Sequence, residues 1–100
     1  MRGTLVGQNH HPTVNVPWTY TVTVTDARGR KLSGTETTQY TFGGAVVGIE
    51  KPENVRFTAG VYRDTIEFPP AAVGHPLNVR AVVHTSLGTL TLDWPIVVKK

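Results

Sequence analysis

Trp18-Thr19-Tyr20-Thr21-Val22-Thr23-Val24-Thr25 is the stretch that decides the fold class of this chain. Every second residue in it is large and apolar, and threonine fills each position between. Successive side chains of a β-strand point to opposite faces, so this alternation predicts a strand with one buried face and one solvated face. Eight consecutive β-branched or aromatic residues also disfavour a helix.

The same alternation returns at the end of the chain, over Thr89–Val98. One face of this second strand collects its large apolar side chains, which are Leu90, Leu92, Trp94, Ile96 and Val98. Pro95 interrupts it and has no N–H to donate to a neighbouring strand. We therefore expect this strand to lie at a sheet edge or to contain a bulge.

The remaining strands are expected between turn signals, at Thr4–Gly7, Thr35–Phe42, Ala45–Ile49, Val55–Thr58, Val61–Phe68 and Leu77–Thr85. Hairpins are predicted across Gly43-Gly44 and across Ala59-Gly60, where glycine tolerates positive φ. The connection Pro69–Pro76 carries at most one helical turn and is expected to cross between sheets. Roughly seven to eight antiparallel strands in two packed sheets with Greek-key connections would bury the apolar faces. The core aromatics are expected to be Trp18, Trp94, Tyr40, Phe42, Phe57 and Phe68.

Composition agrees with a single all-β domain spanning residues 1–100, with roughly the first ten residues as a short edge strand. The chain contains 15 valines and 15 threonines, and 39% of its residues are hydrophobic, which argues against disorder. No apolar run approaches the about 20 residues of a membrane helix, so no transmembrane segment is expected. The absence of cysteine excludes disulfides, thiolate nucleophiles and cysteine-ligated metals.

The charge pattern argues against a nucleic-acid partner. Ten Lys and Arg residues against seven Asp and Glu give a net charge of +3, and the basic residues are scattered. A nucleic-acid-binding domain normally carries a denser basic stripe with interleaved aromatics. The one small basic cluster is Arg28, Arg30 and Lys31, in a turn. It is a candidate for binding an anionic polymer such as an envelope glycan or lipid headgroups, or it is a solvated turn that aids solubility.

Histidines are the candidate metal ligands. His10 and His11 lie in the connection after the first strand, and His75 lies in the connection before the next-to-last strand. In a sandwich both connections fall at the same end, where neutral imidazoles suit copper, nickel or zinc. The alternative is that these are loop histidines bonded to backbone or water, with no cofactor. His84 is expected to point outward from its strand.

No catalytic motif stands out, and we expect the chain not to be an enzyme. A hydrolase-type set can be written from one of two serines with a histidine and an aspartate: Ser33 or Ser86, His84 and Asp93. Neither serine has the context of a nucleophile elbow. The carboxylates weighed for glycoside chemistry are Glu36, Asp64 and Glu67, but nothing in the sequence builds a cleft between them.

Two segments carry a resemblance to a known family. The run Val14–Asp26 with Gly29 and Gly34 resembles the opening of bacterial immunoglobulin-like modules. Gly74-His75-Pro76-Leu77, through Gly88-Thr89-Leu90 to Trp94-Pro95, is similar to their last two strands. Over residues 12–98 the chain resembles the YtkA-like group of secreted bacterial domains. This resemblance implies an immunoglobulin-like fold and an exported protein, and it carries no catalytic residues with it.

These observations together predict a binding or structural module of the bacterial cell envelope. Its partner would be a protein or an envelope glycan. The strand that follows Gly43-Gly44 is the expected unprotected edge, so the chain is expected to be a monomer or a weak edge-strand dimer. The first residues show no charged segment followed by an apolar one, so no signal peptide is expected within this chain.

Overall fold

The structure is a computed structural model that describes residues 1–100. It contains eight strands and one short 3-10 turn. The strands are β1 (Arg2–Gly7), β2 (Trp18–Thr25), β3 (Gly34–Phe42), β4 (Ala45–Ile49), β5 (Val55–Phe57), β6 (Val61–Ile66), β7 (Pro76–Thr85) and β8 (Gly88–Val97), and the turn η1 (Pro70–Ala72) precedes β7. Strand β2 has the predicted bounds.

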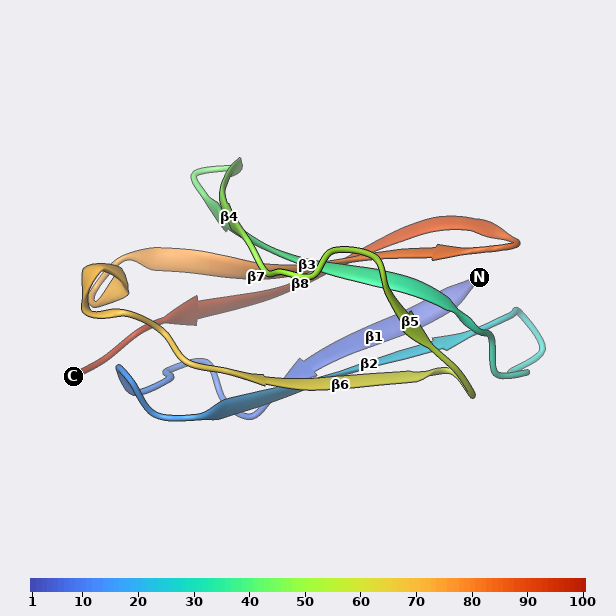
Figure 1. Ribbon diagram of the computed structural model, residues 1–100, viewed down its shortest axis with the longest axis horizontal. Coiled ribbons are helices and arrows are strands. Elements are labelled where there is room, and N and C mark those ends of the chain that lie inside the picture. Colours follow the sequence, from blue (N-terminus) through green and yellow to red (C-terminus); the bar gives the residue numbers. More distant parts are fainter.

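Two antiparallel sheets pack face to face (Figure 1). One has the order β1-β2-β6, and the other has the order β4-β3-β7-β8 with β5 also paired to β3. The chain crosses from one sheet to the other between β2 and β3, between β5 and β6, and between β6 and β7. These are the Greek-key connections of an immunoglobulin-like sandwich, so the predicted fold class is confirmed.

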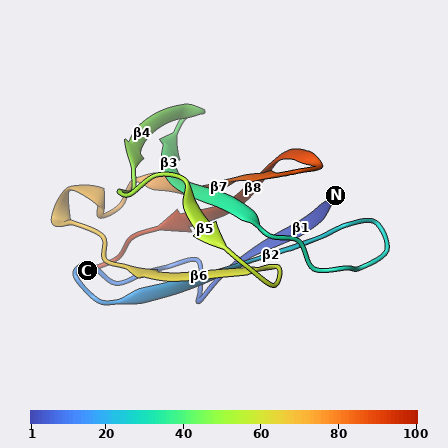
Figure 2. The ribbon, with the colours of Figure 1, turned by 45° about the vertical axis from the view of Figure 1, so that its right-hand side comes forward.

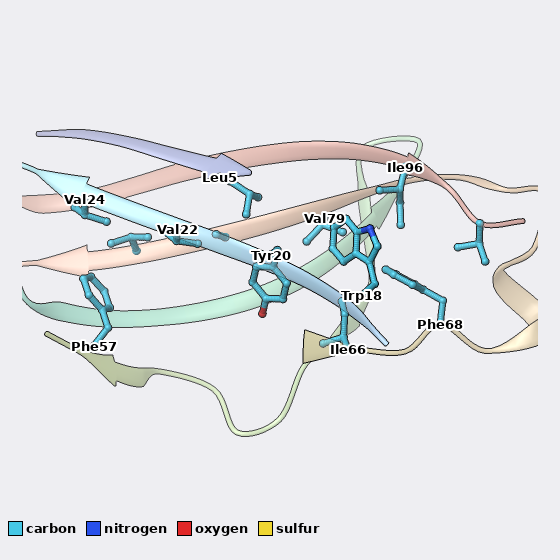
Figure 3. Packing of buried hydrophobic residues seen from close by; sticks show 13 residues of the cluster. Leu5, Trp18, Tyr20, Val22, Val24, Phe57, Ile66, Phe68, Val79 and Ile96 are labelled. Atoms are coloured by element: carbon cyan, nitrogen blue, oxygen red, sulfur yellow. The ribbon is translucent and has the colours of Figure 1, made fainter. Parts of the chain in front are cut away.

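The alternation in β2 builds the core. Its four apolar side chains, Trp18, Tyr20, Val22 and Val24, are at most 1% exposed. They meet the inward face of β7, where Val79, Ala81 and Val83 are fully buried (Figure 3). Side chains of this size stabilise a fold by about 1.5–3 kcal/mol each when buried, before ordering costs.

Glycine at the end of β1 makes room for both tryptophans. A Cβ added at Gly7 would lie 2.5 Å from Nε1 of Trp94 and 2.6 Å from Cη2 of Trp18. Trp18 is buried and Trp94 is half-buried, so the predicted core position of Trp94 holds in part. Asn9 fixes both indoles, because its Oδ1 accepts from Trp18 Nε1 at 3.2 Å and its backbone oxygen accepts from Trp94 Nε1 at 2.9 Å.

The predicted hairpin across Ala59-Gly60 is wrong. Both residues have positive φ, and a single bridge joins Thr58 to Val61, but β5 then pairs with β3 in the opposite sheet. The physical reason is burial of Phe57. It lies opposite Gly34 in the β3–β5 pair and is only 4% exposed, as part of the apolar core between the sheets.

The predicted burial of Phe42 is also wrong, since its side chain is 45% exposed. The hairpin formed by β3 and β4 rises away from the three-stranded sheet (Figure 2). The ring of Phe42 is therefore not covered by the three-stranded sheet, and it lies edge-on to His75 with ring centroids 6.0 Å apart.

The first connection doubles as an extra strand. Residues 10–14 run beside the end of β8, where the N–H of Val97 donates to His10 O at 2.9 Å and the N–H of Lys99 donates to Pro12 O at 2.8 Å. Pro95 lies just before this pairing, on the edge strand β8, as its missing N–H predicts. The segment 10–14 thus covers part of an otherwise open edge.

Candidate functional site

Strand β4 leaves one edge of the five-stranded sheet unpaired. It pairs with β3 through Gln39 opposite Ile49 and Thr41 opposite Val46, and no strand lies on its other side. Its side chains are exposed, with 47% of Val46 and 59% of Val47 accessible. Backbone N–H and C=O groups along such an edge are free to pair with another chain.

An apolar groove runs beside β4, between the β3–β4 hairpin and η1. It consists of two adjoining hollows of about 270 Å³ and 440 Å³. Both hollows are lined by Val47, Pro69, Ala72 and Leu77. Side chains of an added strand therefore have an apolar surface to enter on one side of β4.

A β-bulge turns Val47 toward this groove. The β3–β4 register shifts between Tyr40 and Thr41, so Val47 has no partner on β3. The ring of Tyr40 packs against Gly48, and its hydroxyl donates to Glu50 Oε1 at 2.7 Å. Burial raises the pKa of Tyr40, and the neighbouring Glu50 carboxylate raises it further, so the hydroxyl stays a donor.

The other sheet edges carry the features with which natural sheets avoid unwanted pairing. Strand β6 carries Arg63 and Asp64. Strand β8 carries Asp93 and Pro95 and is partly covered by residues 10–14. Strand β1 lies beside β8 on the other side of the sandwich. Strand β4 has neither a charged residue nor a proline, so it is the least protected of these edges.

A buried carboxyl group lies between the sheets. Glu36 is 1% exposed and accepts a hydrogen bond from Thr38 Oγ1 at 2.6 Å, and Thr38 also bonds the hydroxyl of Tyr20. Burial raises the pKa of Glu36 to about 7; the Thr38 bond opposes this rise, and the charge of Asp64 adds to it. Of the three carboxylates weighed for glycoside chemistry, Glu67 lies apart, at the β4 groove.

The predicted metal ligands do not come together. His10 stacks on Trp94 with ring centroids 4.0 Å apart, and its Nδ1–H donates to Pro95 O at 2.6 Å. His10 and His11 border one open cleft, whereas His75 lines the groove beside β4. No group of three His, Cys, Asp or Glu side chains suited to a metal ion is found. Copper or zinc binding stays a prediction without a geometric site.

Asp26 organises the basic turn. Its Oδ1 accepts from the backbone N–H groups of Arg28 and Arg30, both at 2.9 Å, and its Oδ2 accepts from Arg30 Nε at 2.7 Å. The backbone bond from Arg30, with the side-chain bond, lowers the pKa of Asp26 despite partial desolvation. Part of the positive charge predicted for Arg28, Arg30 and Lys31 is therefore neutralised within the turn. Figure 1 places this turn at the end opposite the segment 10–14.

The hydrolase-type set is only partly assembled. Ser33, Ser86 and His84 line one polar hollow. Asp93 does not line it, and its Oδ1 instead accepts from Arg80 Nε at 3.0 Å. That the chain is not an enzyme stays a prediction.

The groove beside β4 could not be recognised from local sequence. The Gly43-Gly44 turn indicated the edge strand, but the groove is also lined by Ala72 and Leu77, which follow β6 in the sequence. Only the pairing of β3 with both β4 and β7 brings these residues together.

The fold and this surface define an immunoglobulin-like sandwich with one unprotected edge strand. No protein-family model matches the chain, and no curated protein matches its sequence. The structure contains no helix with the length and apolar character needed to span a membrane.

Proposed function

We propose that this chain is a non-catalytic, immunoglobulin-like binding module of the bacterial cell envelope, and that it holds a partner protein along β4. The observation that carries the proposal is the uncharged, exposed edge of β4 beside an apolar groove. Surfaces of this kind recognise extended peptides by strand addition.

The mode of binding follows from strand geometry. A partner segment aligned on β4 would extend the order β4-β3-β7-β8 by one strand, and its backbone would supply the missing hydrogen bonds. Alternate side chains of that segment would point toward the groove lined by Val47 and Leu77. The preferred segment would be apolar where it meets the uncharged lining that both hollows share, whereas Glu50 and Glu67 border one of the two hollows.

The cell-envelope location rests on the resemblance of residues 12–98 to secreted bacterial immunoglobulin-like domains. The cysteine-free composition is compatible with that location but does not require it. Expression of the full natural gene product with a fluorescent tag, followed by cell fractionation, tests the location separately from the binding mode.

A charge placed in β4 tests the binding mode. Val47→Lys puts an ammonium group in the groove, and Val6→Lys makes the same change on β1 at a valine of similar exposure, 53% against 59%. Libraries of displayed peptides about ten residues long are selected on the unmodified chain and then tested on both variants. The proposal expects apolar, alternating peptides whose binding Val47→Lys removes and Val6→Lys leaves intact.

Either of two positive results, or a failed selection, would overturn this binding mode. One is a set of selected peptides that bind the Val47→Lys variant as tightly as the unmodified chain. The other is a dimer, seen by gel filtration at high concentration, that Val47→Lys dissolves, because a second copy would then be the natural occupant of β4. A selection that yields no binding peptide also counts against strand addition.

A further inference from the structure

A second, wholly polar hollow lies at the opposite end of the sandwich from the start of β7. It has a volume of about 250 Å³ and no hydrophobic residue in its lining. It lies where β3 begins and where the turn between β7 and β8 reverses the chain, at the right of Figure 1. Its lining combines a guanidinium, an imidazole and two serine hydroxyls, from Arg56, His84, Ser33 and Ser86.

Strand register sets the two nitrogen-bearing side chains on one face. Thr35 of β3 lies directly opposite Arg56 of β5 on one side and directly opposite His84 of β7 on the other. Directly opposed residues share a face of the sheet, so Arg56 and His84 flank Thr35 on the outer face. Adjacent strands are about 4.8 Å apart, which separates the backbones at Arg56 and His84 by about 10 Å. Two long side chains can close on a small group across that gap.

The side chains that line this hollow keep hydrogen-bond donors without a partner inside the protein. None of the three ion pairs of the chain includes Arg56, whose side chain is exposed. His84 uses Nδ1 toward Thr89 Oγ1 at 2.9 Å, which leaves Nε2 for another partner. Ser33 and Ser86 are exposed as well, and no Asp or Glu lines the hollow.

We propose that this hollow binds a phosphate or sulfate group, either free or carried on a sugar. A guanidinium fork matches two oxygens of such a group, and serine hydroxyls and an imidazole nitrogen complete a ring of donors. The site is distinct from the basic turn, where Asp26 already accepts from Arg30. It is independent of strand addition at β4, so each can fail without the other.

Titration with inorganic phosphate, followed by NMR of the isotope-labelled chain at constant ionic strength, tests the proposal. The expected result is saturable shifts at the amides of Ser33, Arg56 and Ser86 and at the ring of His84, with an affinity in the millimolar range. Glucose 6-phosphate in a parallel titration separates the two sources, because tighter binding of the ester indicates a sugar-linked group. Sulfate tests whether the site requires phosphate.

Matched variants decide which residues hold the anion. Arg56→Gln is expected to weaken binding about tenfold and Ser86→Ala about threefold, as loss of a charge-assisted and of a neutral hydrogen bond predict. Arg63→Gln removes an exposed arginine from β6 and is the control that should leave affinity unchanged. Thermal melts confirm that each variant folds.

Three outcomes would overturn the proposal. The first is the absence of saturable shifts up to high phosphate concentration. The second is equal weakening by Arg56→Gln and Arg63→Gln, which would indicate a diffuse charge effect. The third is a set of shifts centred on Arg28 and Lys31 that Arg56→Gln leaves intact, which would place the anion on the basic turn.

Discussion

Replacing Glu36 by glutamine should stabilise the domain in alkaline solution and leave its stability nearly unchanged in acid. Glu36 is 1% exposed, and none of the ion pairs of the chain supplies a cation to its carboxyl group. Burial, with the nearby charge of Asp64, raises its pKa from 4.5 to about 7. Glutamine has nearly the same shape and keeps an oxygen that can accept the hydrogen bond of Thr38.

The sign and size of the effect follow from proton linkage. Between pH 4.5 and 7 the folded chain binds the Glu36 proton more tightly than the unfolded chain, so this group makes stability fall as pH rises. The loss is complete above pH 7 and absent below pH 4.5. Each pKa unit is worth about 1.4 kcal/mol, so the full cost is about 3 kcal/mol.

Urea unfolding of both proteins from pH 4 to pH 9 measures this difference. The free energy of unfolding of the variant is expected to exceed that of the unmodified chain by about 2–3 kcal/mol at pH 8 and to match it near pH 4. Glu67→Gln, the same change at an exposed carboxylate, controls for the loss of one negative charge. A difference between Glu36→Gln and the unmodified chain that stays constant across this range would refute the reasoning.

Three further predictions concern stability. Gly7→Ala should cost about 2–3 kcal/mol in urea unfolding, since the new methyl group would overlap the indoles of Trp18 and Trp94; an unchanged midpoint would contradict this packing. Trp94→Ala should cost about 3 kcal/mol, at the low end for a tryptophan because the ring is half-buried, and a melt like that of the unmodified chain would contradict its place in the core. Asp93 is partly desolvated, but the hydrogen bonds from Asn78 and Arg80 outweigh this and lower its pKa. The contribution of its carboxylate to stability is therefore present at neutral pH and is lost as pH falls below the ordinary pKa of 3.8. Asp93→Asn should therefore cost up to about 1 kcal/mol at pH 7 and less at pH 2, and an equal cost at both would argue against this ion pair.

Patterns within one strand predicted the fold well, because period-two alternation is a local signal. Strand β2 has its predicted bounds, and Pro95 lies on an edge strand as its missing N–H requires. The pairing of β5 was not predictable in the same way. Ala59-Gly60 forms a tight turn with one bridge, and β5 pairs with β3 because this pairing places Phe57 in the core, a tertiary contact that no local signal reports.

The position of the β3–β4 hairpin relative to the other sheet was also not predictable from the sequence. Phe42 alternates correctly with Tyr40, but the β3–β4 hairpin rises away from the three-stranded sheet, and the Phe42 side chain is 45% exposed. The groove beside β4 was missed for a similar reason, since it forms only where this hairpin faces η1 and the start of β7. The hollow around Arg56 and His84 depends on the registers of β5 and β7 against β3. These registers cannot be predicted from the spacing of residues along the chain.

Amide hydrogen exchange tests the central claim about β4 most directly. It is measured by NMR on the chain alone and on the chain saturated with a peptide selected against it. Peptide binding is expected to protect alternate amides of Ala45–Ile49, while amides along β6 and β8 keep their exchange rates. Protection that appears along β8 or in the loops, with the β4 amides unchanged, would contradict β4 as the docking edge.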